Sequence, residues 1–332
     1  MTTIMSQKHV IQTASRSLLA LIITLVMATA VSAAGNLVSL PAGSVDGLAA
    51  ALASAGPKGI VVVESGMHYE SSTVVIGHEV TIIGEAGAII EGNTTPNLDD
   101  GPPDFIDPVL HIHGARGVVI EGLTIQAAAG SVGNTAILIQ DGPKTTIVGN
   151  DISGHEYGVV VQGGDHTEIL VNSIHDISIF GILNINGQHV RISANTITRV
   201  GVFGIWLCDS NGICQFNSIS QCFFGVMLCR FAEGDAVLPD GSSEGARSTA
   251  TQWQLSNNES YENIVFGFLL TDGANNNILA NNAAWDNGFV DILLDSEFED
   301  FPASFENIIA LGSYGDLSVL DFGIDNKISG EE

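Results

Sequence analysis

The sequence predicts an all-β fold, a single-stranded parallel β-helix in which coils of about 22 residues stack along one axis. One asparagine recurs in each coil, always two residues before an isoleucine, as Asn150, Asn172, Asn195 and Asn217. A glycine recurs in step with it and begins a short apolar stretch, as Gly158, Gly181, Gly204 and Gly225. Short runs rich in Ile and Val between Gly, Asn and Asp are typical of strands and turns.

A further short strand precedes each asparagine, so that each coil contains three strands. This strand aligns Ile147, Ile169, Ile192 and Cys214 at one position of successive coils. One coil cannot bury its own apolar side, whereas neighbours about 4.8 Å apart can, which indicates parallel stacking in register. We interpret the asparagine series as structural: a corner residue in a left-handed backbone conformation whose side chains hydrogen-bond along the axis.

The N-x-I and G-I-x-L pattern resembles the right-handed parallel β-helix proteins of the pectate lyase-like superfamily, over residues 60–324. Residues 56–92 are also similar to the opening coils of that superfamily. The resemblance implies a right-handed solenoid. Its members include lyases, hydrolases, epimerases and tailspike adhesins, so the fold alone does not give the function. The chain has no Asp-Pro-His motif of the alginate epimerase type.

The predicted organisation has four parts. Residues 1–33 resemble a secretory signal peptide, because Lys8 and Arg16 precede an apolar run over 18–31 that is too short to span a bilayer. Residues 34–59 hold a capping helix at 44–55, with Val45, Leu48, Ala49 and Leu52 on one helical face and Gly56 and Pro57 as a stop. The solenoid covers 60–325 and a polar tail covers 326–332. We therefore expect a secreted or periplasmic protein with no stable membrane insertion after cleavage.

The charge and the cysteine content of the chain limit the kinds of ligand that it is expected to bind. The chain carries 37 acidic and 10 basic side chains, a net charge of −27, which disfavours nucleic acid. Its four cysteines lack the spacing of a zinc site. Cys208 and Cys229 fall in one outward column on adjacent coils, close enough to consider a disulfide, whereas Cys214 points inward.

Two insertions interrupt the repeat, and insertions in a solenoid become surface loops. The first, 93–108, carries Asp99, Asp100, Asp104 and Asp107, which form a candidate calcium site or simply a solvated acidic loop. The second, 231–250, leaves from the end of a glycine-led strand and is the expected wall of a groove. Its Glu233 and Asp235 are candidate substrate contacts.

The best candidate constellation lies one position past the end of the glycine-led strand, where successive coils place Asp141, Gly163, Asn186, Asp209, Arg230 and Asp272. Asp209, Arg230 and Asp272 are the candidate catalytic residues, since carboxylates and a cation can perform acid and base work on a glycan. Asn186 and Asp141 are candidate substrate contacts, and Trp206 is a candidate platform for a sugar ring. A plain surface ion pair explains Asp209 and Arg230 as well.

These residues favour an exported protein that binds, and in one interpretation cleaves or modifies, an extracellular or envelope polysaccharide. Alternation also predicts an outward apolar stripe, exposed unless something covers it: Leu138, Val160, Leu183, Trp206, Met227, Leu269 and Leu293. Such a stripe supports a homo-oligomer or a non-catalytic adhesin or scaffold. Scattered histidines leave a periplasmic metal-handling role as a second alternative.

Overall fold

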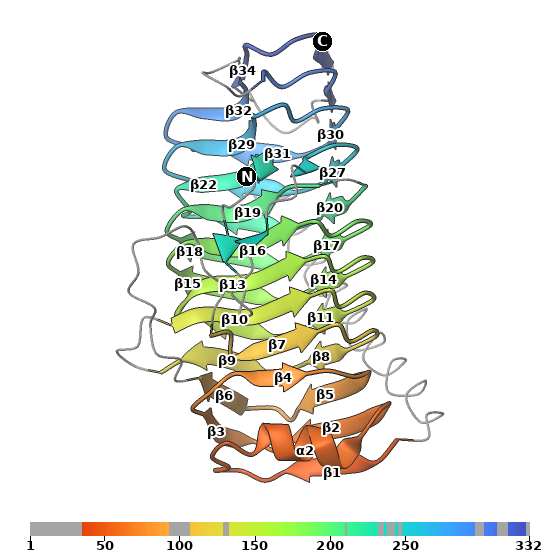
Figure 1. Ribbon diagram of the computed structural model, residues 1–332. Helices are drawn as coiled ribbons and strands as arrows, with labels where there is room; N and C mark the ends of the chain where they lie inside the picture. The colour runs from red at the N-terminus through yellow and green to blue at the C-terminus, as the bar shows by residue number, and fades with distance from the viewer. Residues whose placement is uncertain are drawn as a thin grey trace.

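The chain winds into a solenoid of about ten turns whose strands fall into three parallel sheets. The computed structural model describes residues 35–92, 107–128, 133–209, 211–231, 236–237, 243–244, 248–295, 302–310 and 318–329. Figure 1 shows the coils rising from the amino-terminal strands at the base to the carboxyl-terminal strands at the top. Each repeat visits sheet C, then sheet A, then sheet B, and neighbouring coils pair in parallel.

Sheet A contains the strands that precede the asparagines: β1 (Leu37–Leu40), β2 (Gly59–Val63), β5 (Val80–Gly84), β8 (Val119–Glu121), β11 (Thr146–Val148), β14 (Glu168–Leu170), β17 (Arg191–Ser193), β20 (Ile213–Gln215), β27 (Gln254–Ser256), β30 (Ile278–Ala280), β33 (Ile308–Ala310) and β35 (Lys327–Ser329). Sheet B contains the strands that follow them: β3 (Gly66–Glu70), β6 (Ala88–Gly92), β9 (Thr124–Ala127), β12 (Asp151–Ser153), β15 (Ser173–Ile177), β18 (Thr196–Val200), β21 (Ser218–Ser220), β28 (Glu259–Tyr261) and β31 (Ala283–Trp285).

Sheet C contains the predicted glycine-led strands: β4 (Val74–Ile76), β7 (Leu110–His113), β10 (Gly133–Gln140), β13 (His155–Gln162), β16 (Phe180–Ile185), β19 (Phe203–Leu207), β22 (Phe224–Leu228), β29 (Phe266–Leu270), β32 (Val290–Leu294) and β34 (Val319–Asp321). Two short antiparallel pairs lie in the second insertion: β23 (Arg230–Phe231) with β26 (Ser248–Thr249), and β24 (Ala236–Val237) with β25 (Ser243–Glu244).

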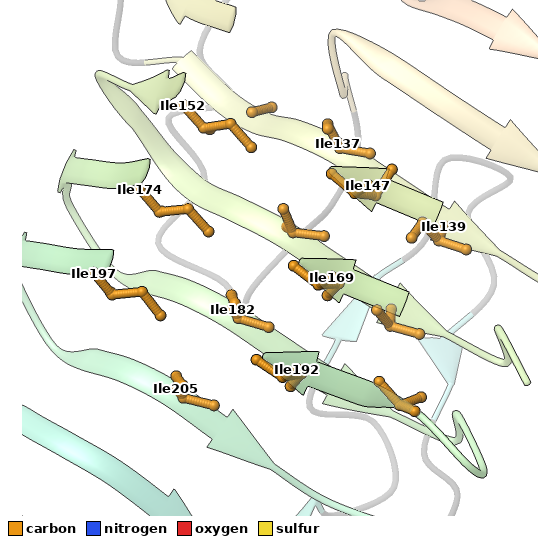
Figure 2. Packing of buried hydrophobic residues seen from close by; sticks show 14 of the residues in the cluster. Ile137, Ile139, Ile147, Ile152, Ile169, Ile174, Ile182, Ile192, Ile197 and Ile205 are labelled. Atoms are coloured by element: carbon orange, nitrogen blue, oxygen red, sulfur yellow. The ribbon is translucent and has the colours of Figure 1, made fainter. Parts of the chain in front are cut away.

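The core consists of aliphatic columns that run along the solenoid axis. Figure 2 shows Ile147, Ile169 and Ile192 of sheet A beside Ile152, Ile174 and Ile197 of sheet B, with the sheet C isoleucines among them. All six are fully buried. Burying one such side chain stabilises the fold by roughly 1.5–3 kcal/mol, so the repeated isoleucine explains why coils stack in this register.

The corner asparagines form the predicted ladder along the axis. Asn172 donates its Nδ2–H to the backbone oxygen of Ile147 at 2.9 Å and to Oδ1 of Asn195 at 3.0 Å. The predicted left-handed conformation is wrong for these asparagines. The residue before each one adopts it instead, with φ of 64° at Gly149, 58° at Val171, 57° at Ala194 and 56° at Phe216. The asparagine side chain points inward, because it hydrogen-bonds the backbone of the preceding coil. The left-handed residue that bends the chain is therefore the one before the asparagine.

The glycines of sheet C allow neighbouring coils to approach closely. A Cβ on Gly158 would lie 2.4 Å from the carbonyl oxygen of Gly181, and a Cβ on Gly181 would lie 2.5 Å from that of Gly204. A Cβ essentially never lies this close to an oxygen atom to which it is not bonded, so only glycine fits at these positions.

A helix covers the amino-terminal end of the solenoid, as predicted, but it is shorter than expected. Helix α2 (Leu48–Ala55) buries Leu48, Ala51, Leu52 and Ala55. The expectation that Val45 and Ala49 share one helical face with Leu48 and Leu52 is wrong. Val45 lies before the helix and pairs with Tyr69 in a bridge, while Ala49 is exposed and the two leucines are buried.

A carboxylate from another coil completes the start of this helix. Gly47 has no side chain to cap it, and Glu70 accepts the backbone N–H of Leu48 at 3.0 Å. Burial raises the pKa of Glu70. Within the ranges that the structure describes, no helix is long and apolar enough to cross a membrane. The predicted leader, residues 1–33, lies outside those ranges.

Candidate functional site

Polar side chains gather on the outer side of sheet C, at the carboxyl ends of its strands. The strand register and the backbone hydrogen bonds that continue it define one outward column, which we call the strand-end column: His113, Gln140, Gln162, Ile185, Cys208, Cys229, Thr271 and Asp295. Since adjacent members lie one coil apart, side chains on neighbouring coils can act on one ligand.

The predicted constellation forms a second column, one position further along: Asp141, Gly163, Asn186, Asp209, Arg230 and Asp272. All of these except Arg230 have left-handed backbone conformations, with φ between 51° and 80°. Such a corner favours Gly, Asn and Asp, so the turn itself accounts for the residue types at Asp141 and Asn186. A substrate-binding role for these two stays a prediction.

Asp272 has a carboxylate neighbour that the sequence analysis missed. The hydroxyl of Thr271 lies 3.1 Å from Oδ1 of Asp272 and 3.3 Å from Oδ2 of Asp295. One hydroxyl has one proton to donate, so it cannot hydrogen-bond two charged carboxylates at once. When Asp272 is protonated, the Thr271 oxygen can accept a hydrogen bond from the carboxyl O–H of Asp272 while the Thr271 O–H donates to Asp295. The shared hydroxyl therefore links the two carboxyl groups.

The surroundings of Asp272 disfavour its charged form relative to water. Burial raises its pKa, and the charge of Asp295 adds to the rise. The hydrogen bond from Thr271 and the positive charge of Arg230 oppose it without cancelling it. A carboxyl group with a raised pKa beside a second carboxyl group is an arrangement that general acid and base catalysis can use.

Arg230 supplies the positive charge at this site. It begins β23, where the chain leaves the solenoid for the second insertion, and its side chain is half-buried. Its Nε is buried and has no hydrogen-bond partner among the described residues. An unused guanidinium donor beside two carboxyl groups suits a ligand with negative or hydroxyl oxygens. Asp209 lies on the coil next to it in the same column.

Trp206 packs within an apolar cluster on the outer side of sheet C. Its ring lies 4.9 Å from the ring of Phe180 and 5.0 Å from that of Phe203, and its Nε1–H donates to Sγ of Cys229. The stripe to which it belongs is not exposed. Leu138, Val160 and Leu183 are fully buried, and the other aliphatic members are less than one-tenth exposed. The structure therefore gives no support to an oligomer through an exposed stripe, and the platform role of Trp206 stays a prediction.

An aromatic column that was not among the predicted features lies beside this stripe. Rings stack along the axis at centroid distances of 5.0–5.6 Å, in the order Tyr157, Phe180, Phe203, Phe224 and Phe266. The signal was present in the sequence, because each of these residues directly precedes the glycine of its coil.

Four of the described histidines form two local pairs. His166 and His189 stack at 4.7 Å, and His111 and His113 both lie near Oε1 of Gln140. His155 is buried, and neither of its ring nitrogens has a hydrogen-bond partner within the described ranges. Across the described part of the chain, no group of three His, Cys, Asp or Glu side chains is arranged to hold a metal ion.

Several predicted site residues cannot be placed. Glu233, Asp235, Asp99, Asp100 and Asp104 lie outside the described residues. Asp107, the last member of the candidate calcium loop, is half-buried at the start of a described range.

Comparisons with known proteins agree with this geometry. Residues 108–235 match the family model described as a right handed beta helix region. No curated protein sequence matches the chain. The enzymatically active domain of tailspike protein 2 from bacteriophage CBA120 is similar in structure, with a TM-score of 0.62 and 12% identity over 88% of this chain and 46% of that chain.

Two solved enzymes are also similar. For a family 28 exopolygalacturonase of Yersinia enterocolitica, the TM-score is 0.54, with 12% identity over 90% of this chain and 69% of that one. For pectate lyase Pel9A, the TM-score is 0.53, with 11% identity over 83% of this chain and 73% of that one. The chain spans 59% of another tailspike protein, from Dettilon. The match to the right handed beta helix region, the three parallel sheets and these similar folds show that the chain folds as a right-handed parallel β-helix.

Proposed function

We propose that this protein is exported and acts on an extracellular or cell-envelope polysaccharide at the outer side of sheet C. The observation that carries the proposal is the pair of carboxyl groups, Asp272 and Asp295, that share the Thr271 hydroxyl beside Arg230. The similar structures support the substrate class, since they include a pectate lyase and an exopolygalacturonase.

The chemistry follows from the unequal carboxyl groups. Asp272, whose burial favours the protonated form, donates a proton to the departing glycosidic oxygen. Asp295, which lies within hydrogen-bond distance of the Thr271 hydroxyl, acts as the base or nucleophile on the opposite side of the bond. Arg230 turns its free Nε–H toward a hydroxyl or carboxylate of the sugar and holds that ring at the carboxyl pair.

A glycan-binding screen of the full chain, with and without calcium, followed by product detection on every glycan bound, tests the proposal. We expect one class of glycan to bind and to be turned over, with turnover abolished in Asp272→Asn. Asp286→Asn is a matched control, because Asp286 occupies another left-handed corner with φ of 55°, after sheet B. No binding across a broad screen would refute the polysaccharide proposal. Binding without turnover would refute its catalytic part.

A non-catalytic adhesin or scaffold is the second candidate, and one surface feature favours it. Phe223, Ile264 and Phe289 lie on successive coils at the corner between sheets B and C, and they are 38%, 63% and 66% exposed. Exposed apolar clusters of this kind commonly contact another macromolecule. Binding to a glycan or cell surface that Asp272→Asn leaves intact and Phe289→Asp abolishes would favour this candidate.

A further inference from the structure

Two cysteines lie side by side on the outer face of sheet C. Leu207 and Leu228 are register partners in the pair β19 and β22, and each is followed directly by a cysteine. The ladder continues past these leucines, since Cys208 donates its N–H to Asn184 and Cys229 donates its N–H to Leu207. Cys208 and Cys229 are therefore direct neighbours on adjacent coils, at a strand spacing of about 4.8 Å. That spacing falls within the Cα separations that disulfides span, about 4.4–6.8 Å.

The side chains of these two residues meet. Both belong to the strand-end column, point to the same side of the sheet and are fully buried. Burial raises the pKa of the Cys208 thiol well above its usual value, and a hydrogen bond with the Cys229 thiol raises it further. The Trp206 Nε1–H donates to Sγ of Cys229 and fixes the position of that sulfur against its neighbour.

The other two cysteines are placed differently. Cys214 lies inside sheet A, where its thiol contacts Asn217 and Asn258, and burial raises its pKa to about 12. Cys222 lies at the corner before β22, with its thiol near the backbone oxygen of Ser220. Neither has a cysteine on the adjacent position of a neighbouring coil. Cys214 and Cys222 therefore serve as internal controls for a disulfide that requires two cysteines in register on adjacent coils.

We propose that Cys208 and Cys229 form a disulfide that ties two adjacent coils of the solenoid below the candidate site. The oxidant is a disulfide compound, either a small-molecule disulfide or a dithiol oxidoreductase in its disulfide form. One cysteine thiolate attacks that disulfide and releases one thiol, and the second cysteine thiolate then displaces the other sulfur from the mixed disulfide. One disulfide forms, one is reduced to two thiols, and two protons pass from the cysteines to the released thiolates.

The burial of the two thiols determines when the disulfide forms. A fully buried thiol with a raised pKa yields almost no thiolate, so the folded, reduced protein reacts slowly. The bond therefore forms while the coils assemble. After folding, dithiothreitol alone leaves it intact, and dithiothreitol with denaturant removes it.

The test counts thiols in the full chain after refolding from urea in a buffer of reduced and oxidised glutathione. Unreduced protein, unfolded again and titrated with Ellman's reagent, is expected to show two of its four thiols, against four after full reduction. Cys208→Ser and Cys229→Ser should each show three, because the partner is released, while Cys214→Ser should show one. Peptide mapping without reductant should join the peptides that contain Cys208 and Cys229.

Four thiols in the refolded wild-type protein would overturn the proposal. A bridge to Cys214 or Cys222 in the peptide map would overturn it equally. The thiol count of the wild-type protein does not depend on glycan binding or turnover, so this proposal and the proposed function can fail separately.

Discussion

Asn172 donates its backbone N–H to Oδ1 of Asn195, one coil further on, at 2.9 Å. The same oxygen also accepts the Asn172 side-chain amide at 3.0 Å. The ladder repeats this arrangement from coil to coil, as at Asn195 and Asn217 and at Asn258 and Asn282. Each asparagine thus satisfies buried backbone groups that the corner would otherwise leave without partners.

Asn195→Ala should therefore destabilise the protein strongly. The substitution leaves the backbone N–H of Asn172 and one side-chain N–H of Asn172 buried without the oxygen that accepts both. Each such group costs about 1–3 kcal/mol, so the free energy of unfolding should fall by about 3 kcal/mol or more. Urea unfolding followed by circular dichroism measures the loss. Asn257→Gly, at an exposed corner with φ of 55°, should change the stability by less than about 1 kcal/mol. Similar losses in the two variants would contradict the ladder.

Val171→Asn should stabilise the protein. Val171 is β-branched and half-buried, yet it adopts φ of 58°, a conformation that strains such side chains. Asn257 and Asn281 occupy equivalent corners with φ of 55° and 54°. The substitution should raise the free energy of unfolding by about 1 kcal/mol, measured by urea unfolding. Val148→Asn, within strand β11, serves as the control and should destabilise the protein.

Sequence periodicity was sufficient to predict the coil of three strands and the columns of inward-facing side chains. Side chains alternate between the two faces of a strand, and the repeat length is fixed, so few other arrangements are possible. It could not place the bend relative to the asparagine, since Val171 and Phe216 carry no preference for the conformation that they adopt. It also missed Asp295. Asp295 aligns with Thr271, not with Asp272, so a search along one column does not join the two carboxyl groups.

The candidate site could not be predicted from the repeat, because it depends on how individual side chains pack between coils. Asp141, Asn186, Asp209 and Asp272 share one corner position, and all four have the left-handed conformation. Residue type alone therefore could not distinguish a turn-forming aspartate from a functional one. What sets Asp272 apart is its burial beside Asp295 and Arg230, and this arises from packing between coils.

Asp272→Asn should separate catalysis from stability. Burial raises the pKa of Asp272, so the folded state disfavours its charged form relative to the unfolded state, and the uncharged amide should leave the thermal midpoint unchanged or higher. Turnover of a glycan found in the binding screen should fall by about 10²–10⁴-fold, the usual contribution of a general acid. Wild-type turnover should decline as the pH rises through the pKa of Asp272, as the acid loses its proton. A lower thermal midpoint with unchanged turnover would contradict the assignment.

His155 should make the protein sensitive to mild acid. Burial lowers its pKa from 6.5 to about 4, and no described residue hydrogen-bonds to either ring nitrogen. Since the pKa in the folded state lies below that in the unfolded state, the stabilisation is complete above pH 6.5 and is lost as the pH falls toward 4. The loss amounts to about 3 kcal/mol below pH 4. His155→Leu should remove this part of the pH dependence of urea unfolding, whereas His166→Asn, at an exposed left-handed corner, should retain it. The same steep decline between pH 6.5 and 4 in His155→Leu would show that other groups cause it.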